Sequence, residues 1–206
     1  MEFVSIAVSV LALMVSITTL WLTYLRRGHI KMTQPTMIFF GPDGGQKATS
    51  KVFLRTLLYS TSKRGNIVEN FYVRLCRGET QQNFSTWIYG EENHARGSGL
   101  FVGPEGVSTN HHFLTPTDVQ NFQFAAGDYQ VQVFCKLVNR PSAQLLSIIR
   151  LRIGEAEALK MSEPGFGIFF DWGPDSGQYQ VHVDQQRLET KEPASPARNA
   201  LRGRGA

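Results

Sequence analysis

The sequence predicts a mainly β protein: one N-terminal transmembrane helix, then an antiparallel β-sandwich with a short helix and a hairpin at its C-terminal end. Three observations predict this fold. The chain opens with a long uncharged apolar run, short segments of alternating apolar and polar residues follow, and turn sequences rich in glycine and proline separate them. A chain of 206 residues has room for one anchor, one domain and a short tail.

The apolar run is Phe3–Leu25, which holds 23 residues and no charge. As a helix it reaches about 34 Å, enough to cross a hydrocarbon core of about 30 Å. Trp21 and Tyr24 lie near its end, where amphipathic rings prefer the membrane interface. A cleaved signal peptide would need a basic start, a shorter apolar core and a small-x-small cleavage site. We therefore predict an uncleaved anchor over residues 1–27, joined by a linker over 28–35.

The charges that flank the run predict its orientation. Glu2 precedes the helix, whereas Arg26, Arg27 and Lys31 follow it. The positive-inside rule then places the amino terminus outside and the C-terminal domain in the cytoplasm. We expect the three basic residues to contact lipid head groups.

Small residues form a stripe along one side of the predicted helix, because their spacing alternates between four and three. The stripe consists of Ser5, Ser9, Ala12, Ser16, Thr19 and Thr23. Such a stripe lets a second helix approach closely, which predicts a homo-oligomer or a partner helix. Alternatively, the hydroxyls bond to carbonyls of their own helix and the stripe faces lipid.

Short strand candidates follow one another from residue 36 to residue 153, separated by turn signals, and this pattern is typical of a sandwich. They are Thr36–Phe40, Lys51–Ser62, Ile67–Arg77, Phe84–Tyr89, Gly99–Gly103, Val107–Leu114, Tyr129–Val138 and Gln144–Ile153. The apolar residues of Gln144–Ile153 are nearly continuous, so this segment is compatible with a helix as well.

Residues 154–162 predict a short helix that ends before Pro164-Gly165. A hairpin follows, with its turn at Gly173–Gly177, and together these elements form an extension over residues 154–183. Residues 184–206 are polar and rich in proline, alanine, arginine and glycine, which predicts a disordered tail.

The segment Asn121–Tyr129, which runs on into Val131, Val133 and Cys135, resembles the corner between strands E and F of immunoglobulin-like sandwiches. The order Cys76, Trp87, Cys135 is similar as well, although Tyr129 lies six residues before Cys135 instead of two. This resemblance implies a fold and carries no functional residues. A Cys76–Cys135 disulfide and two buried thiols are both compatible with it, and a cytoplasmic location favours the thiols.

No sequence motif for catalysis or for a cofactor is present. The net charge of +4 is modest and no basic stripe occurs, which argues against nucleic-acid binding. We therefore predict a membrane-anchored, non-enzymatic interaction module whose partners are the lipid bilayer and either another protein or a second copy. The alternative is a small-molecule or metal-binding domain around His111 and His112, with His94 or Asp118 as further ligands. Adjacent strand residues point to opposite faces, so a metal would require a loop at this position.

Overall fold

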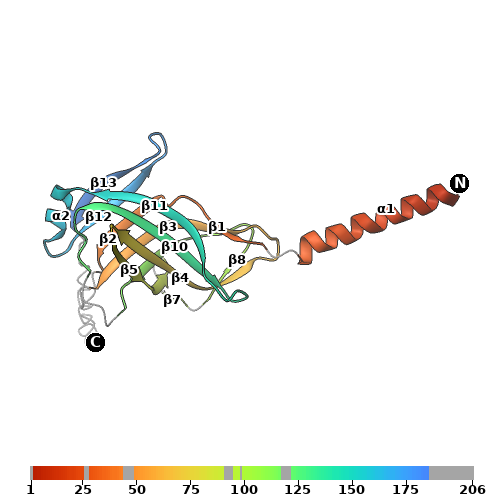
Figure 1. The fold of residues 1–206 in the computed structure, drawn as a ribbon, viewed down its shortest axis with the longest axis horizontal. Coiled ribbons are helices and arrows are strands. Elements are labelled where there is room, and N and C mark those ends of the chain that lie inside the picture. The colour runs from red at the N-terminus through yellow and green to blue at the C-terminus, as the bar shows by residue number, and fades with distance from the viewer. Residues whose placement is uncertain are drawn as a thin grey trace, which may run out of the picture.

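The computed structural model of the protein describes residues 2–25, 28–43, 49–90, 95–97, 99–116 and 122–185. The chain begins with helix α1 (Glu2–Leu20), which continues into a wider π-helical turn, η1 (Trp21–Leu25). Residues Glu2–Thr23 are long and apolar enough to cross a membrane, with a mean hydropathy of 2.3. No residue of α1 is buried, and Figure 1 shows the helix projecting away from the β-domain.

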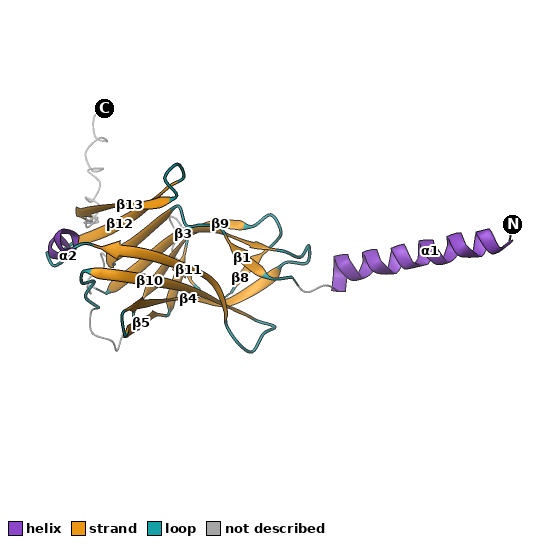
Figure 2. Cartoon of the chain, turned by 45° about the horizontal axis from the view of Figure 1, so that its top comes forward, coloured by secondary structure: helices purple, strands orange, loops and turns teal. Residues whose placement is uncertain are grey.

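The β-domain consists of two antiparallel sheets that pack face to face as two layers (Figure 2). The first sheet, here sheet A, has the order β13-β12-β2-β3-β9-β6-β7. Strand β1 also pairs with β3, at residues 58–60, beyond the part of β3 that pairs with β2. Its strands are β1 (Ile30–Met32), β2 (Met37–Pro42), β3 (Ser50–Ser60), β6 (Thr86–Tyr89), β7 (Ala95–Arg96), β9 (Val107–Leu114), β12 (Phe166–Gly173) and β13 (Gln178–Gln185).

The second sheet, here sheet B, has the order β11-β10-β4-β5, and β8 also pairs with β4. Its strands are β4 (Asn66–Arg77), β5 (Thr80–Phe84), β8 (Leu100–Val102), β10 (Gly127–Leu137) and β11 (Gln144–Ile153). Helix α2 (Glu155–Met161) connects β11 of sheet B to β12 of sheet A, so it closes one end of the sandwich.

The core lies between the sheets because alternate residues of each strand point inward. Strand β10 shows this alternation most clearly, since every second residue from Tyr129 to Leu137 is buried. Sheet A contributes buried side chains to the same core from β2, β3, β9 and β12: Ile38, Phe40, Val52, Leu54, Leu58, Phe113, Ile168 and Phe170.

The predicted fold class is confirmed in its mainly β content, its two antiparallel sheets, its N-terminal apolar helix and its short helix and hairpin near the C-terminus. Of the two predictions for Gln144–Ile153, the strand is correct. This segment pairs with β10, and Ile149, Leu151 and Ile153 face the core.

The prediction of one strand over Phe84–Tyr89 is wrong. Phe84 ends β5 in sheet B, whereas Thr86 begins β6 in sheet A, so the chain crosses between the sheets at Ser85. The reason is the spacing of two core residues. Phe84 and Trp87 are both buried, and a regular strand points residues three apart to opposite faces. The bend at Ser85 allows both side chains to enter the core.

Two segments predicted to lie outside the sandwich take part in sheet A. Strand β1 lies within the expected linker 28–35, and Ile30 is buried there. The hairpin of the expected extension pairs with β2, through Ile168–Asp171, and so continues the sheet. Strand β13 ends at Gln185, and the rest of the predicted tail lies outside the described residues.

Both cysteines are free thiols. Cys76 lies opposite Gln130 on the outer face of sheet B, whereas Cys135 lies opposite Phe71 on the buried face. Phe71 and Cys76 are five residues apart on β4, so about 17 Å of strand separates the two thiol positions. The disulfide alternative is therefore wrong, and only Cys135 is fully buried.

Candidate binding cleft

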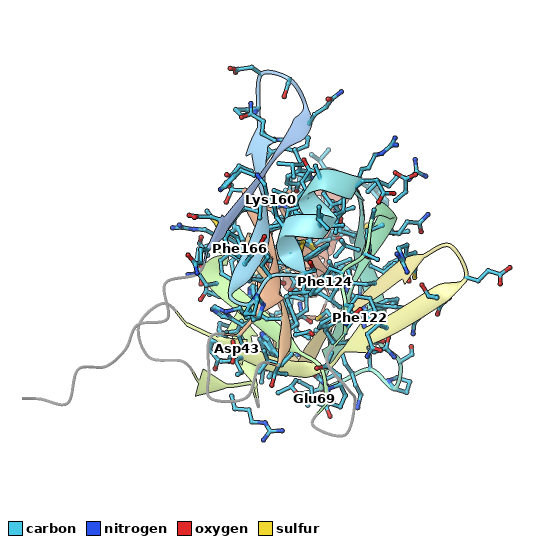
Figure 3. All side chains as sticks on the ribbon, turned by 90° about the vertical axis from the view of Figure 1, so that its left-hand side faces the viewer. Asp43, Glu69, Phe122, Phe124, Lys160 and Phe166 are labelled. Carbon is cyan, nitrogen blue, oxygen red and sulfur yellow. The ribbon has the colours of Figure 1, made fainter. Side chains whose placement is uncertain are left out.

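A cleft of about 620 Å³ opens at the end of the β-domain where α2 lies. Its walls are α2, the segment Phe122–Ala126 that leads into β10, and the turn Pro164–Phe166 that leads into β12. Figure 3 looks onto this end of the domain, with Phe122, Phe124 and Phe166 below the helix that carries Lys160. The volume lies within the range of small-ligand sites, about 300–1,000 Å³.

The wall formed by Phe122–Ala126 is irregular in backbone but held in place by side chains of neighbouring strands. The Ser50 hydroxyl donates to the carbonyl of Phe122 at 2.8 Å. The Tyr129 hydroxyl donates to the carbonyl of Ala125 at 2.7 Å, and burial raises the pKa of this phenol, which therefore keeps its proton. The Arg77 guanidinium donates to the carbonyl of Ala126 at 3.1 Å. Three carbonyls of the segment are thus satisfied without a regular strand.

Aromatic rings fix the same wall from below. Phe124 stacks on Phe40 at 5.3 Å between ring centroids and touches Phe122 edge to face at 5.1 Å. Phe84 packs edge to face against Phe122 at 5.8 Å, which ties the wall to sheet B. Since Phe40 belongs to sheet A, both sheets support the wall, and we regard it as preformed.

Helix α2 forms the opposite wall with a mixed surface. Ala158 and Met161 pack against the core, whereas Leu159 is 73% exposed. Glu155 and Glu157 lie in the first turn and Lys160 in the last turn, an arrangement that complements the helix dipole.

The described lining of the cleft is apolar with an acidic edge. Its charged side chains are Glu155 and Glu163, and none of its described residues is basic. Its two serines are already engaged, since Ser50 donates to Phe122 and Ser162 donates to the carbonyl of Leu159 at 2.6 Å. The arrangement can hold apolar groups and attract a positive charge at the edge.

The predicted histidine site is divided between two faces of β9, as strand alternation requires. His111 is fully buried between the sheets, where the Trp87 indole N–H donates to its Nδ1 at 3.2 Å. Burial and, secondarily, the neighbouring His112 lower the pKa of His111 to about 3, so the ring is neutral. His112 lies on the outer face with its ring 5.0 Å from that of Phe53. Among the described residues no group of three metal-ligating side chains occurs, and the further ligands His94 and Asp118 lie outside them.

The predicted stripe lies on the exposed surface of α1, apart from Thr23 in η1. Three of its hydroxyls bond to carbonyls one turn earlier: Ser9 to Ser5, Ser16 to Ala12 and Thr19 to Val15. These bonds agree with the second of the two alternatives, while helix association through the stripe stays a prediction.

Among the predicted membrane-interface residues, Trp21 is 53% exposed in η1 and Lys31 is exposed on β1. The backbone of Tyr24 continues η1, and Arg26 and Arg27 lie outside the described residues.

Sequence patterns did not reveal the cleft, because its lining comes from three separate parts of the sequence, within residues 41–50, 122–126 and 155–166. The available signal was the pair Phe122 and Phe124 in a stretch that ends in Ala125-Ala126-Gly127, outside any strand pattern. Comparison with known proteins adds no relative: no family model, no curated protein and no solved structure gives a significant match to this chain.

Proposed function

We propose that this protein is a membrane-tethered, non-enzymatic interaction module that binds a segment of another protein in the cleft between α2 and Phe122–Ala126. The observation that carries the proposal is the combination of a preformed apolar cleft with an acidic edge. The partner segment that fits it carries apolar side chains flanked by lysine or arginine.

The position of the cleft supports this role. Helix α2 lies at the end of the β-domain opposite to the departure of α1 (Figure 1). A helix that spans a membrane would hold the other end of the domain at the lipid surface and leave the cleft facing the solvent. The basic flank Arg26-Arg27 supports a cytoplasmic location for the domain, and hence for the partner.

The engaged serines support binding over catalysis. A nucleophilic hydroxyl needs a base within hydrogen-bond reach, whereas Ser50 and Ser162 donate to backbone carbonyls. The alternative ligand site at His111 and His112 receives no such support, because the two rings lie on opposite faces of β9.

We also infer that the sandwich is immunoglobulin-like. The hydrogen bond from the Tyr129 hydroxyl to the carbonyl four residues upstream supports this, since the tyrosine corner of that fold has the same form. Two features differ from the usual immunoglobulin pattern. The two cysteines lie on neighbouring strands of one sheet, and Trp87 packs against Phe71.

The test presents the full chain, reconstituted in lipid nanodiscs, to a library of displayed peptides. We expect enrichment of peptides that combine apolar and basic residues. The double variant Glu155→Lys and Glu163→Lys should weaken their binding at least about tenfold, as expected for the loss of about 1.4 kcal/mol of charge attraction. Leu159→Asp should weaken it as well, because this side chain lines the cleft and is 73% exposed, so the fold does not depend on it.

The matched control is Leu145→Asp, which places the same new charge at an exposed position of sheet B and should bind like the unmodified chain. The proposal fails if no peptide is enriched, or if the enriched peptides bind the cleft variants and the control equally. Enrichment of acidic peptides would overturn the charge argument in particular.

A further inference from the structure

The connection between α1 and the β-domain is very short. Two residues, Arg26 and Arg27, separate Leu25 of η1 from Gly28. Three successive Cα–Cα steps of about 3.8 Å allow at most about 11 Å between Leu25 and Gly28. The end of the β-domain that holds Gly28 therefore lies close to the end of the apolar helix.

From Gly28 onward the chain is fixed to the domain. Gly28 is buried so closely against Ser62 that a Cβ at this position would collide with the Cβ of Ser62. His29 and Thr61 exchange two hydrogen bonds: the His29 amide donates to the Thr61 hydroxyl at 2.8 Å, and the Thr61 amide donates to the His29 carbonyl at 3.0 Å. The connection from α1 is thus held against the β3–β4 turn at its first domain residues, Gly28 and His29.

Three large apolar side chains are exposed together at this end. Ile67, Phe101 and Val138 are 49%, 58% and 54% exposed. Ile67 pairs with Phe101 across β4 and β8, and the Val138 amide donates to the Ile67 carbonyl at 3.2 Å. The three residues therefore form one continuous apolar group.

Basic side chains outnumber acidic ones in the segments that form this end of the domain. The segments 28–32, 58–67, 99–107 and 137–143 contain four basic residues and one acidic residue: Lys31, Lys63, Arg64 and Arg140, against Glu105. Arg64 and Arg140 line a hollow of about 180 Å³ together with Gly28, and an Arg140 amino group lies 3.5 Å from Nδ1 of His29. Figure 2 shows β8 and the β10–β11 turn on the side of the domain from which α1 departs.

We propose that this surface, the membrane-proximal rim (Ile67, Phe101 and Val138 with Lys63, Arg64 and Arg140), binds the anionic head groups of the bilayer that α1 spans. The basic side chains pair with lipid phosphates and the apolar group enters the interface. The short tether argues for lipid as the occupant, because it holds the rim within reach of the surface. The proposal rests on the membrane anchor of the proposed function. It adds that the domain is docked on the membrane in one orientation.

The test measures amide hydrogen exchange of the full chain in nanodiscs of phosphatidylcholine alone and of phosphatidylcholine mixed with phosphatidylglycerol. We expect exchange in residues 61–67, 99–103 and 138–141 to slow about threefold or more in the anionic discs, an effect that added salt reverses. Exchange in α2 and Phe122–Ala126, at the far end, should be equal in both discs.

The triple variant Lys63→Glu, Arg64→Glu and Arg140→Glu should lose this difference, and so should Phe101→Ser in large part. Lys160→Glu removes a basic residue at the far end and should keep it. Equal exchange of the rim in both discs, in a chain that stays with the discs, overturns the rim proposal alone. A chain that separates from the discs during size exclusion overturns the anchor itself. Equal slowing in the triple variant and the unmodified chain would also refute the role of the basic residues.

Discussion

At the scale of single residues, the two adjacent histidines show how strand alternation separates neighbours. His111 is enclosed by Trp87, Phe71 and Phe113, with ring centroids 4.9 to 6.4 Å away. Because the Trp87 N–H donates to Nδ1, this nitrogen has no proton, and the neutral ring carries its proton on Nε2. The ring acts as a core aromatic residue that accepts one hydrogen bond.

His111 should therefore make the stability of the β-domain depend on pH. The unfolded chain protonates this side chain below its ordinary pKa of 6.5, whereas the folded chain protonates it only near pH 3. The free energy of unfolding is unaffected by His111 above pH 6.5 and falls as the pH drops below it. Between pH 6.5 and pH 4 the loss is about 3 kcal/mol, at about 1.36 kcal/mol per pH unit.

Denaturant unfolding of the full chain in detergent, followed by tryptophan fluorescence between pH 7 and pH 4, measures this loss. His111→Phe should be less stable at pH 7, because it leaves the Trp87 N–H without its acceptor, and should lose less stability toward pH 4. His29→Gln changes an exposed histidine and should keep the dependence of the unmodified chain. An unchanged dependence in His111→Phe would show that other groups cause it.

At the scale of elements, the segment Phe122–Ala126 depends on bonds from outside itself, and Tyr129→Phe tests them. This change removes the hydroxyl that donates to Ala125 and keeps the ring, which is 1% exposed. We expect the free energy of unfolding to fall by about 1 kcal/mol, as for the loss of one hydrogen bond. Amide exchange in residues 122–126 should also become faster, and peptide binding in the cleft should weaken. Tyr179→Phe, which removes a partly buried phenol that donates to the carbonyl of Pro35, should leave residues 122–126 unchanged.

Strands were predictable from the sequence where buried and exposed residues alternate regularly. The elements that were not predictable lack such an alternation, for physical reasons. Strand β9 matches its predicted range, and its two buried residues, His111 and Phe113, alternate with partly exposed neighbours. The crossing at Ser85 was not predictable, because nothing local shows that Phe84 and Trp87 enter the core from different sheets. Strand β1 is three residues long, too short to show a period, and it is stabilised by its pairing with β3. The cleft forms where α2 and Phe122–Ala126 come together in the folded domain, and a local sequence pattern does not show such a tertiary contact.

At the scale of the whole molecule, the two ends of the β-domain differ in chemistry. The end near α1 is basic and exposes a small apolar group, which suits an anionic lipid surface. The far end carries a cleft whose described charged lining is acidic, which suits a basic protein segment and is repelled by anionic lipid. In the two proposals, the same membrane anchor docks one end of the β-domain on the bilayer and presents the other end to a protein partner.

The orientation of this arrangement across the membrane can be measured with the native thiols. Cys76 is partly exposed on sheet B and lines a surface hollow, whereas Cys135 is buried and burial raises its pKa to about 12, so it stays unreactive. With the domain in the cytoplasm, a membrane-impermeant maleimide should not label the full chain in intact spheroplasts and should label it after permeabilisation. Cys76→Ser should abolish the labelling and Cys135→Ser should preserve it. Labelling of Cys76 in intact spheroplasts would place the domain, its cleft and its basic rim on the outer side, and would contradict the orientation that Arg26 and Arg27 predict.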